Sequence, residues 1–320
     1  SNGFTKIIWP EKQVTIMIFP ILPKYYKIAV PTYFYVDEYE LNSDDVKIYL
    51  ESKDCISLPS FGDVLKLLKT GKTCLEKLEE DDIYDCIFVV SRFSSLDSII
   101  PIIENNKSKN IVFVGNNISV EKYMNIKNKN VLFAFFMAAG KKYDGYIDSI
   151  CLNKIEIGRV DGKDINNEFI NSIFKETKIK VTIENKMNDY LKTHACAVLP
   201  LVFASYKVNG NLKLLKKDKE YSLLIMDAII EGYDVLKKLG YEILPKGEYE
   251  NCVNKKKFCA FIYRFMFSNF IGKMCISDHA MSARDEFLLL NSEFEKLRKK
   301  SKLETKVYDQ LKLELLNYKD

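Results

Sequence analysis

The hydrophobic pattern changes character about halfway along the chain. In the first half, short continuous apolar runs are separated by polar stretches, without the alternation of a strand that has one wet face. Such runs are typical of strands buried on both faces of a parallel sheet. The strands predicted in this way are residues 14–19, 46–50, 86–90, 111–114 and 131–135.

Helix-like segments separate these runs, which favours βαβ units in a doubly wound sheet. They are predicted at residues 61–69, 96–105 and 120–124. From about Asn185 onwards helical periodicity dominates. The helices predicted there are residues 188–206, 218–239, 257–271 and 278–300. Asp218 and Asp278 are candidate N-caps and Gly240 is a candidate C-cap. We therefore predict an α/β domain over residues 1–180 and an all-helical domain over residues 181–320.

Composition and charge narrow the classes of function. The 320 residues carry 48 Lys and Arg against 44 Asp and Glu, a net charge of +4, and the pI is about 8.4. This net positive charge is too small for a typical nucleic-acid-binding protein. Eight Cys without CxxC spacing and two His predict reduced thiols, a cytoplasmic location and no metal site. No apolar run reaches the roughly 20 residues of a membrane span, so no membrane partner is expected.

Four segments carry a resemblance to a known family. They are residues 81–92 (DDIYDCIFVVSR), 189–195 (DYLKTHA), 239–245 (LGYEILP) and 278–286 (DHAMSARDE). Together they resemble the ketopantoate reductase (2-dehydropantoate 2-reductase) family over about residues 72–312. The resemblance implies a Rossmann-like domain followed by a helical domain like the C-terminal domain of 6-phosphogluconate dehydrogenase. It also implies an oxidoreductase that reduces a small 2-oxo acid to a 2-hydroxy acid with NADPH or NADH, and a homodimer.

The same resemblance suggests catalytic residues. It gives Lys192 as the general acid and Glu286 as the residue that positions the substrate hydroxyl. The chemistry suits these types, since hydride addition to a ketone builds negative charge on oxygen, which a proton-bearing cation stabilises. The alternative is that Lys192 is one more solvated lysine, as most lysines are.

Candidate binding residues come from the same comparison and from strand ends. Arg92 ends a predicted strand and Asn116 follows another, where a nucleotide would bind; Glu51, after residues 46–50, suits a ribose 2′-hydroxyl. The candidate substrate contacts are Asn188, Asp278 and Asn291.

The front of the chain departs from a dinucleotide-binding pattern. Such a domain opens with a strand that runs into G-x-G-x-x-G, but no glycine lies between Gly3 and Gly62. The region is rebuilt, or cofactor binding is lost, or the fingerprint lies upstream of the first residue. Cys196 also stands one turn after Lys192, where the family often has Asn. The alternative function is therefore a non-catalytic relative that kept the fold as a ligand-binding or dimeric scaffold.

A further apolar face lies in the second half. Residues 258–270 (FCAFIYRFMFSNF) are more apolar than one face of a small domain usually exposes. They are either core within the helical domain or a homodimer interface, and the sequence does not separate the two.

Overall fold

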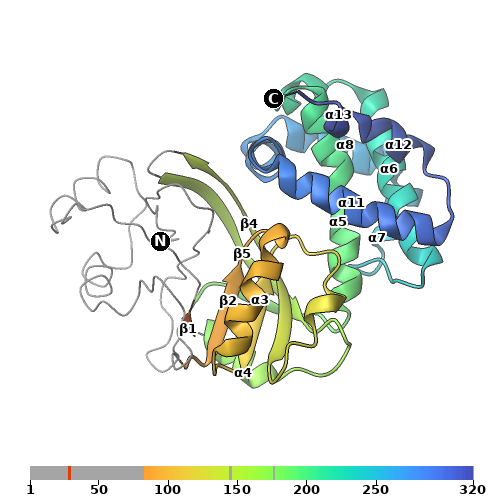
Figure 1. The fold of residues 1–320 in the computed structure, drawn as a ribbon. Coiled ribbons are helices and arrows are strands. Elements are labelled where there is room, and N and C mark those ends of the chain that lie inside the picture. The colour runs from red at the N-terminus through yellow and green to blue at the C-terminus, as the bar shows by residue number, and fades with distance from the viewer. Residues whose placement is uncertain (1–27, 30–82, 144–145, 176, 320) are drawn as a thin grey trace, which may run out of the picture.

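The structure is a computed structural model that describes residues 28–29, 83–143, 146–175 and 177–319. The predicted strands at 14–19 and 46–50, the predicted helix at 61–69 and the candidate Glu51 lie outside these described residues. Within them, the chain forms a sheet domain followed by a helical domain (Figure 1).

The sheet has its described strands in sequence order, β1 to β6. All neighbouring pairs are parallel except β4 and β5, which form a long antiparallel hairpin that projects from the sheet (Figure 1). The strands are β1 Ile28–Ala29, β2 Cys86–Val90, β3 Asn110–Val114, β4 Asn130–Tyr143, β5 Tyr146–Gly158 and β6 Lys180–Ile183.

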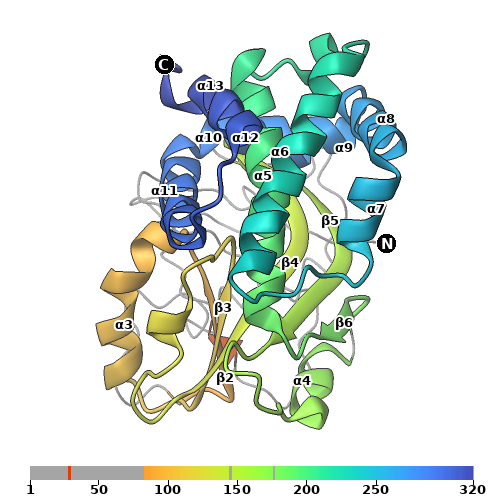
Figure 2. The same cartoon turned by 90° about the vertical axis from the view of Figure 1, so that its right-hand side faces the viewer.

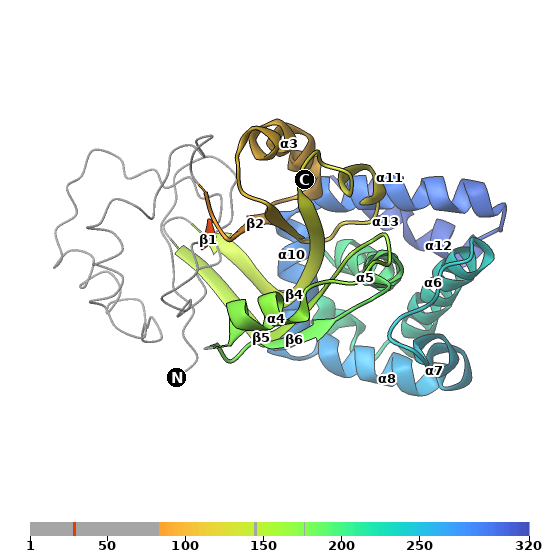
Figure 3. The same ribbon diagram turned by 90° about the horizontal axis from the view of Figure 1, so that it is seen from below.

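Helices cover both faces of this sheet, as Figure 3 shows for α3 and α4. Helix α3, Leu96–Asn105, and the start of α5, Met187–Lys207, pack on the face that includes Ile87 and Phe113. Helix α4, Asn167–Phe174, packs on the opposite face against Phe88. The continuous apolar runs are explained, because strands between two helical layers have no wet face.

The helical domain is built around α5 and α6, Lys219–Lys238, which run through its centre (Figure 2). The two helices approach closely at Gly232, where a Cβ atom would come within 3.2 Å of Cys196 Cβ. The other helices are α7 Glu248–Asn254, α8 Lys256–Phe267, α9 Phe270–Gly272, α10 His279–Ser282, α11 Arg284–Ser301, α12 Lys306–Leu311 and α13 Leu313–Leu316. Short 3-10 turns are η1 Phe93–Ser95, η2 Glu121–Tyr123 and η3 Leu212–Leu215, and η4, Lys273–Asp278, is a π-helix.

The predicted fold class, an α/β domain followed by a helical one, is confirmed. The Asp218 carboxylate caps α6 by accepting a hydrogen bond from the Tyr221 backbone N–H at 2.8 Å. The single helix predicted at residues 278–300 is wrong in one respect, because the chain breaks at Ala283 (φ −136°, ψ 41°) between α10 and α11. Asp278 has helical backbone angles and caps neither of them.

One face of α8 and the start of α9 are open to solvent. The exposed apolar side chains there are Phe258, Phe261, Ile262, Phe265, Phe270 and Ile271, and Phe265 reaches 64% exposure. Ala260 and Phe267 are buried in the helical core, so the interpretation of residues 258–270 as core within the domain holds for the other face of α8 only. In the part of the chain that the structure describes, no helix has the length and apolarity to cross a membrane.

Candidate active site at the domain junction

A short loop after β3 is the centre of the candidate site. Residues 115–121 leave the carboxyl end of β3 and run between the two domains. The loop begins at Gly115, whose φ of +148° is rare for side-chain-bearing residues, and a Cβ there would lie 3.2 Å from the Ser91 carbonyl oxygen. The chain therefore brings the ends of β2 and β3 together at this point, where ligands bind in open α/β sheets.

Lys192 of α5 holds this loop from one side. Its Nζ donates to the Ile118 carbonyl oxygen at 3.0 Å, to Glu121 Oε1 at 2.7 Å and to Asn188 Oδ1. The Lys192 side chain is 2% exposed and that of Glu121 is 47% exposed. Burial lowers the pKa of Lys192, and Glu121 opposes that shift. Lys192 is thus a buried cation whose three N–H donors all have protein acceptors.

Glu286 of α11 holds the loop from the other side. Its Oε1 accepts a hydrogen bond from Asn116 Nδ2 at 2.9 Å, and its Oε2 lies 3.6 Å from His279 Nε2. Burial raises the pKa of Glu286, but His279, Asn116 and Arg92 outweigh it and the net shift is downward. Glu286 is therefore an ionised carboxylate in a site where only 10% of the side chain is exposed.

Arg92 approaches the same place from the end of β2. Its Nη2 donates to the Ser282 carbonyl oxygen of α10 at 3.5 Å, and its charge acts on Glu286. Among the described residues it has no carboxylate within ion-pair distance. Arg159 and Arg298, by contrast, both pair with carboxylates. Arg92 is thus a half-buried guanidinium with donors to spare for an anionic ligand.

The structure brings some of the predicted residues together. Lys192, Asn188, Asn116 and Glu286 contact loop 115–121 or one another at the junction, and the charge of Arg92 acts on Glu286. Asn188 Nδ2 also donates to Glu121 Oε1 at 3.2 Å, so its amide bridges the partners of the buried lysine.

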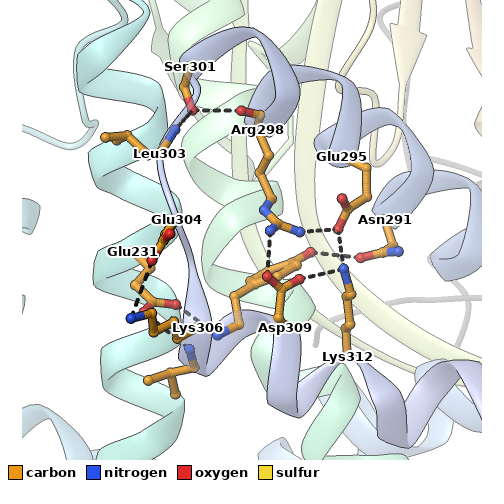
Figure 4. Close-up of polar contacts among 12 residues, drawn as sticks. Glu231, Asn291, Glu295, Arg298, Ser301, Leu303, Glu304, Lys306, Asp309 and Lys312 are labelled. Atoms are coloured by element: carbon orange, nitrogen blue, oxygen red, sulfur yellow. Dashed lines mark hydrogen bonds and ion pairs between the residues drawn. The ribbon is translucent and has the colours of Figure 1, made fainter.

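Other predicted residues lie elsewhere. Asp278 pairs with Lys273 on the same π-helix, at 2.5 Å. Asn291 is buried between α11 and α12, where its Oδ1 accepts a hydrogen bond from Tyr308 at 2.9 Å, beside the Arg298–Asp309 pair (Figure 4). Cys196 is fully buried against α6, so the position one turn after Lys192 faces the helical core.

Sequence reasoning missed two residues of the site, Glu121 and His279. Glu121 lies 71 residues before its partner Lys192, and no spacing in the sequence connects them. His279 carried a signal, because it stands within the segment 278–286 and seven residues before Glu286.

The described residues offer a nicotinamide cofactor a partial fit. The Oδ1 atoms of Asn116 and Asn117 are buried without a hydrogen-bond partner, so they suit an amide donor of a ligand. Arg92 suits an anionic group at the neighbouring strand end. The side of the site where the cofactor phosphates would bind differs from a dinucleotide-binding pattern. Strand β1 lies beside β2. The residues that follow β1 in the sequence, VPTYF at 30–34, include no glycine, and their proline lacks an N–H donor.

Comparison with solved structures identifies the architecture. The dimeric ketopantoate reductase from Staphylococcus aureus matches 74% of this chain and 78% of its own, with 13% identity and a TM-score of 0.57. D-mandelate dehydrogenase with NADH and anilino(oxo)acetate matches 75% of this chain and 77% of its own, with 15% identity and a TM-score of 0.58. For 2-dehydropantoate 2-reductase from Porphyromonas gingivalis the shares are 76% and 77%, with 11% identity and a TM-score of 0.55.

These similarities define a class by fold: a two-domain protein with a dehydrogenase-type sheet domain and a helical second domain. The particular architecture is that of ketopantoate reductases, so the resemblance drawn from the four sequence segments is confirmed at the level of fold. No protein-family model matches the chain, and no curated protein does either.

Proposed function

We propose that the protein is an oxidoreductase that reduces a small 2-oxo acid to a 2-hydroxy acid with a nicotinamide cofactor. One observation carries the proposal. A buried cation, Lys192, and a buried ionised carboxylate, Glu286, hold one loop from opposite sides, at the strand ends where a ligand would bind. The cofactor would supply the hydride. The protein would bind the keto acid, stabilise the charge that develops on its oxygen and exclude water.

The roles proposed for the side chains follow from their charges. Lys192 places a positive charge beside the reacting oxygen, and Glu286 receives the substrate hydroxyl. Asn116 and Arg92 are proposed to contact the cofactor, and Asn188 the substrate. A cytoplasmic location belongs to the same proposal, supported by the six free cysteines of the described residues.

The test measures the stability of the full chain as NADPH and, separately, NADH is added. Turnover is then measured with ketopantoate and other 2-oxo acids. We expect one cofactor to stabilise the fold, by about 2.7 kcal/mol at a concentration of 100 times its dissociation constant. Lys192→Met should lower turnover by roughly 100-fold while cofactor binding persists. No stabilisation by either cofactor at millimolar concentration would sink the proposal.

A second candidate is a non-catalytic scaffold, and a specific observation favours it. All three N–H donors of Lys192 are already taken by protein acceptors, an arrangement that also suits a purely structural lysine. The glycine-free segment at residues 4–61 points the same way. In that case neither cofactor binds, and Lys192→Met changes only the free energy of unfolding.

We also propose that the protein is a homodimer. The exposed apolar face of α8 supports this, because such faces commonly mark interfaces and two-fold symmetry lets one face cover its own copy. The dimeric neighbour from Staphylococcus aureus is consistent with it.

A further inference from the structure

The candidate site contains a second proton-bearing group beside Glu286. His279 is the first residue of α10, and its Nε2 lies 3.6 Å from Glu286 Oε2. The ring rests edge-on against Phe287, with centroids 4.9 Å apart, and the side chain is 31% exposed. His279 is therefore held by protein on one side and open to a small molecule on the other.

The break at Ala283 creates this pair. On an unbroken helix, residues seven apart lie on one face but about 10 Å apart along the axis. Here the chain changes direction between α10 and α11, so His279 and Glu286 come within ion-pair distance. Because Asn116 occupies Glu286 Oε1, the carboxylate is fixed with Oε2 toward the imidazole. A carboxylate in this position orients a histidine ring.

Lys192 is less suited to give up a proton. Its three N–H donors bind Ile118, Glu121 and Asn188, so a proton from Nζ would leave one of those acceptors without a donor. The Nδ1 atom of His279, by contrast, has no hydrogen-bond partner among the described residues. A carboxylate within ion-pair distance of one ring nitrogen, with the other nitrogen open to a ligand, is an arrangement that suits a histidine general acid.

We propose that His279 is a catalytic residue that donates the proton to the keto oxygen, with Glu286 as the positioning residue that holds the ring. This inference rests on the proposed function. The carbonyl carbon gains a hydride from a reduced nicotinamide, which is thereby oxidised. The carbonyl π bond breaks, its electron pair moves to oxygen, and that oxygen takes the proton from Nδ1. The products are the 2-hydroxy acid and a neutral imidazole.

Several charged or titratable groups face this histidine. Glu286 comes from α11, His194 from α5 and Arg92 from the end of β2, where its charge acts on Glu286. On its own segment, Asp278 is engaged with Lys273. Among the described residues, Glu286 is the carboxylate that lies within ion-pair distance of the ring.

The first measurement needs no turnover. The chain has only two histidines, so His194→Gln assigns both sets of imidazole signals in the NMR spectrum of the full-length protein. Glutamine carries no charge, so we expect Glu286→Gln to move the ring signals of His279 at constant pH. The matched control is Glu293→Gln, which removes a carboxylate that holds the same loop through Ser119 and should leave those signals in place. Unchanged His279 ring signals in Glu286→Gln would overturn the pairing.

The second measurement separates catalysis from binding. We expect His279→Asn to lower kcat by about 100-fold or more, with KM and the dissociation constant of oxamate, a non-reducible 2-oxo acid analogue, changed less than about threefold. His279→Gln serves as a second variant if His279→Asn unfolds.

The outcomes distinguish the two proposals. Turnover by the wild type with kcat of His279→Asn within a factor of three, or with only KM raised, would overturn this assignment and leave the proposed reduction standing. Turnover of no 2-oxo acid by the wild type would overturn both. A His279→Asn protein that no longer binds oxamate would show that the histidine holds the site together, which also contradicts the assignment.

Discussion

Asn116 Nδ2 donates a hydrogen bond to Glu286 Oε1 at 2.9 Å, across 170 residues of sequence. The bond joins the loop after β3 of the sheet domain to α11 of the helical domain. It also selects which oxygen of Glu286 is left for His279. The contact therefore matters to both the stability of the domain junction and the chemistry proposed for it.

Asn116→Asp should turn this contact from attraction into repulsion. The new carboxylate would face Glu286 at hydrogen-bond distance, and two carboxylates that close cannot both ionise. We expect the free energy of unfolding at pH 7 to fall by roughly 1–3 kcal/mol in urea denaturation. The loss should shrink as the pH drops and the pair takes up a proton. The double variant Asn116→Asp with Glu286→Gln restores the bond in reverse and should regain most of the loss. Equal stability of the single variant and the wild type at pH 7 would contradict the contact.

His194 should make the protein sensitive to mild acid. Burial lowers the pKa of His194 to about 4, with a smaller contribution from His279, and its ring lies 4.0 Å from that of Phe135. In the unfolded chain this pKa is about 6.5. Between these values the unfolded chain binds a proton that the folded chain does not, so the free energy of unfolding decreases as the pH falls through this window, by up to about 3 kcal/mol.

The measurement is urea unfolding between pH 7 and pH 4. His194→Gln should flatten the dependence on pH in this range, since glutamine does not titrate. Its stability at pH 8 serves as the baseline for the packing lost with the ring. A slope as steep as that of the wild type would assign the acid sensitivity to other groups.

Tyr308→Phe should destabilise the packing of α12 on α11. The hydroxyl donates to Asn291 Oδ1 at 2.9 Å, one of the polar contacts drawn in Figure 4. Both residues are buried. Without the hydroxyl the amide oxygen is left unsatisfied, at a cost of about 1–3 kcal/mol. We expect the thermal midpoint to drop while KM for any 2-oxo acid stays unchanged. A rise in KM for Asn291→Ala would return Asn291 to the substrate site that the sequence predicted.

Phe265→Asp should weaken the proposed homodimer. Phe265 is 64% exposed on the apolar face of α8, so a charge there costs little in the monomer but is buried in a dimer that uses this face. Sedimentation equilibrium should show a smaller average mass than for the wild type. Leu214, 66% exposed on η3, provides the control, and Leu214→Asp should leave the mass unchanged. A wild-type protein that sediments as a monomer would refute the dimer.

The sequence anticipated the elements whose hydrophobic pattern is regular. The strand Cys86–Val90 and the helix Leu96–Asn105 agree with the predicted ranges, because an unbroken apolar run and a clear helical period each permit one structure. Strand β4 runs beyond the predicted residues 131–135 to Tyr143. Its last residues include a glycine and two lysines, so they lack the continuous apolar run that predicted the strand. Helix α4 was not predicted, although its N-cap Asn166 accepts a hydrogen bond from the Phe169 backbone N–H.

The site was less accessible to sequence reasoning. Lys192 and Asn188 could be paired in advance, since they are one turn apart on one helix. The contacts of Asn116 with Glu286 and of Lys192 with Glu121 depend on how the domains meet, which no local pattern encodes. Asn291 and Asp278 follow the resemblance in sequence, but helix packing directs their side chains to Tyr308 and Lys273.

Loop 115–121 also makes the two ends of the junction thermodynamically dependent on each other. Lys192 binds the loop at Ile118, and Glu286 binds it at Asn116. A ligand that draws Asn116 away from Glu286 therefore moves the loop and alters the contacts of Lys192. By thermodynamic linkage, a change in the lysine contacts alters the free energy of ligand binding by the same amount. A substitution of Glu121, which lies outside the ligand contacts, should therefore alter ligand affinity. A segment that joins the domains in this way would give the protein communication between its halves without a separate hinge.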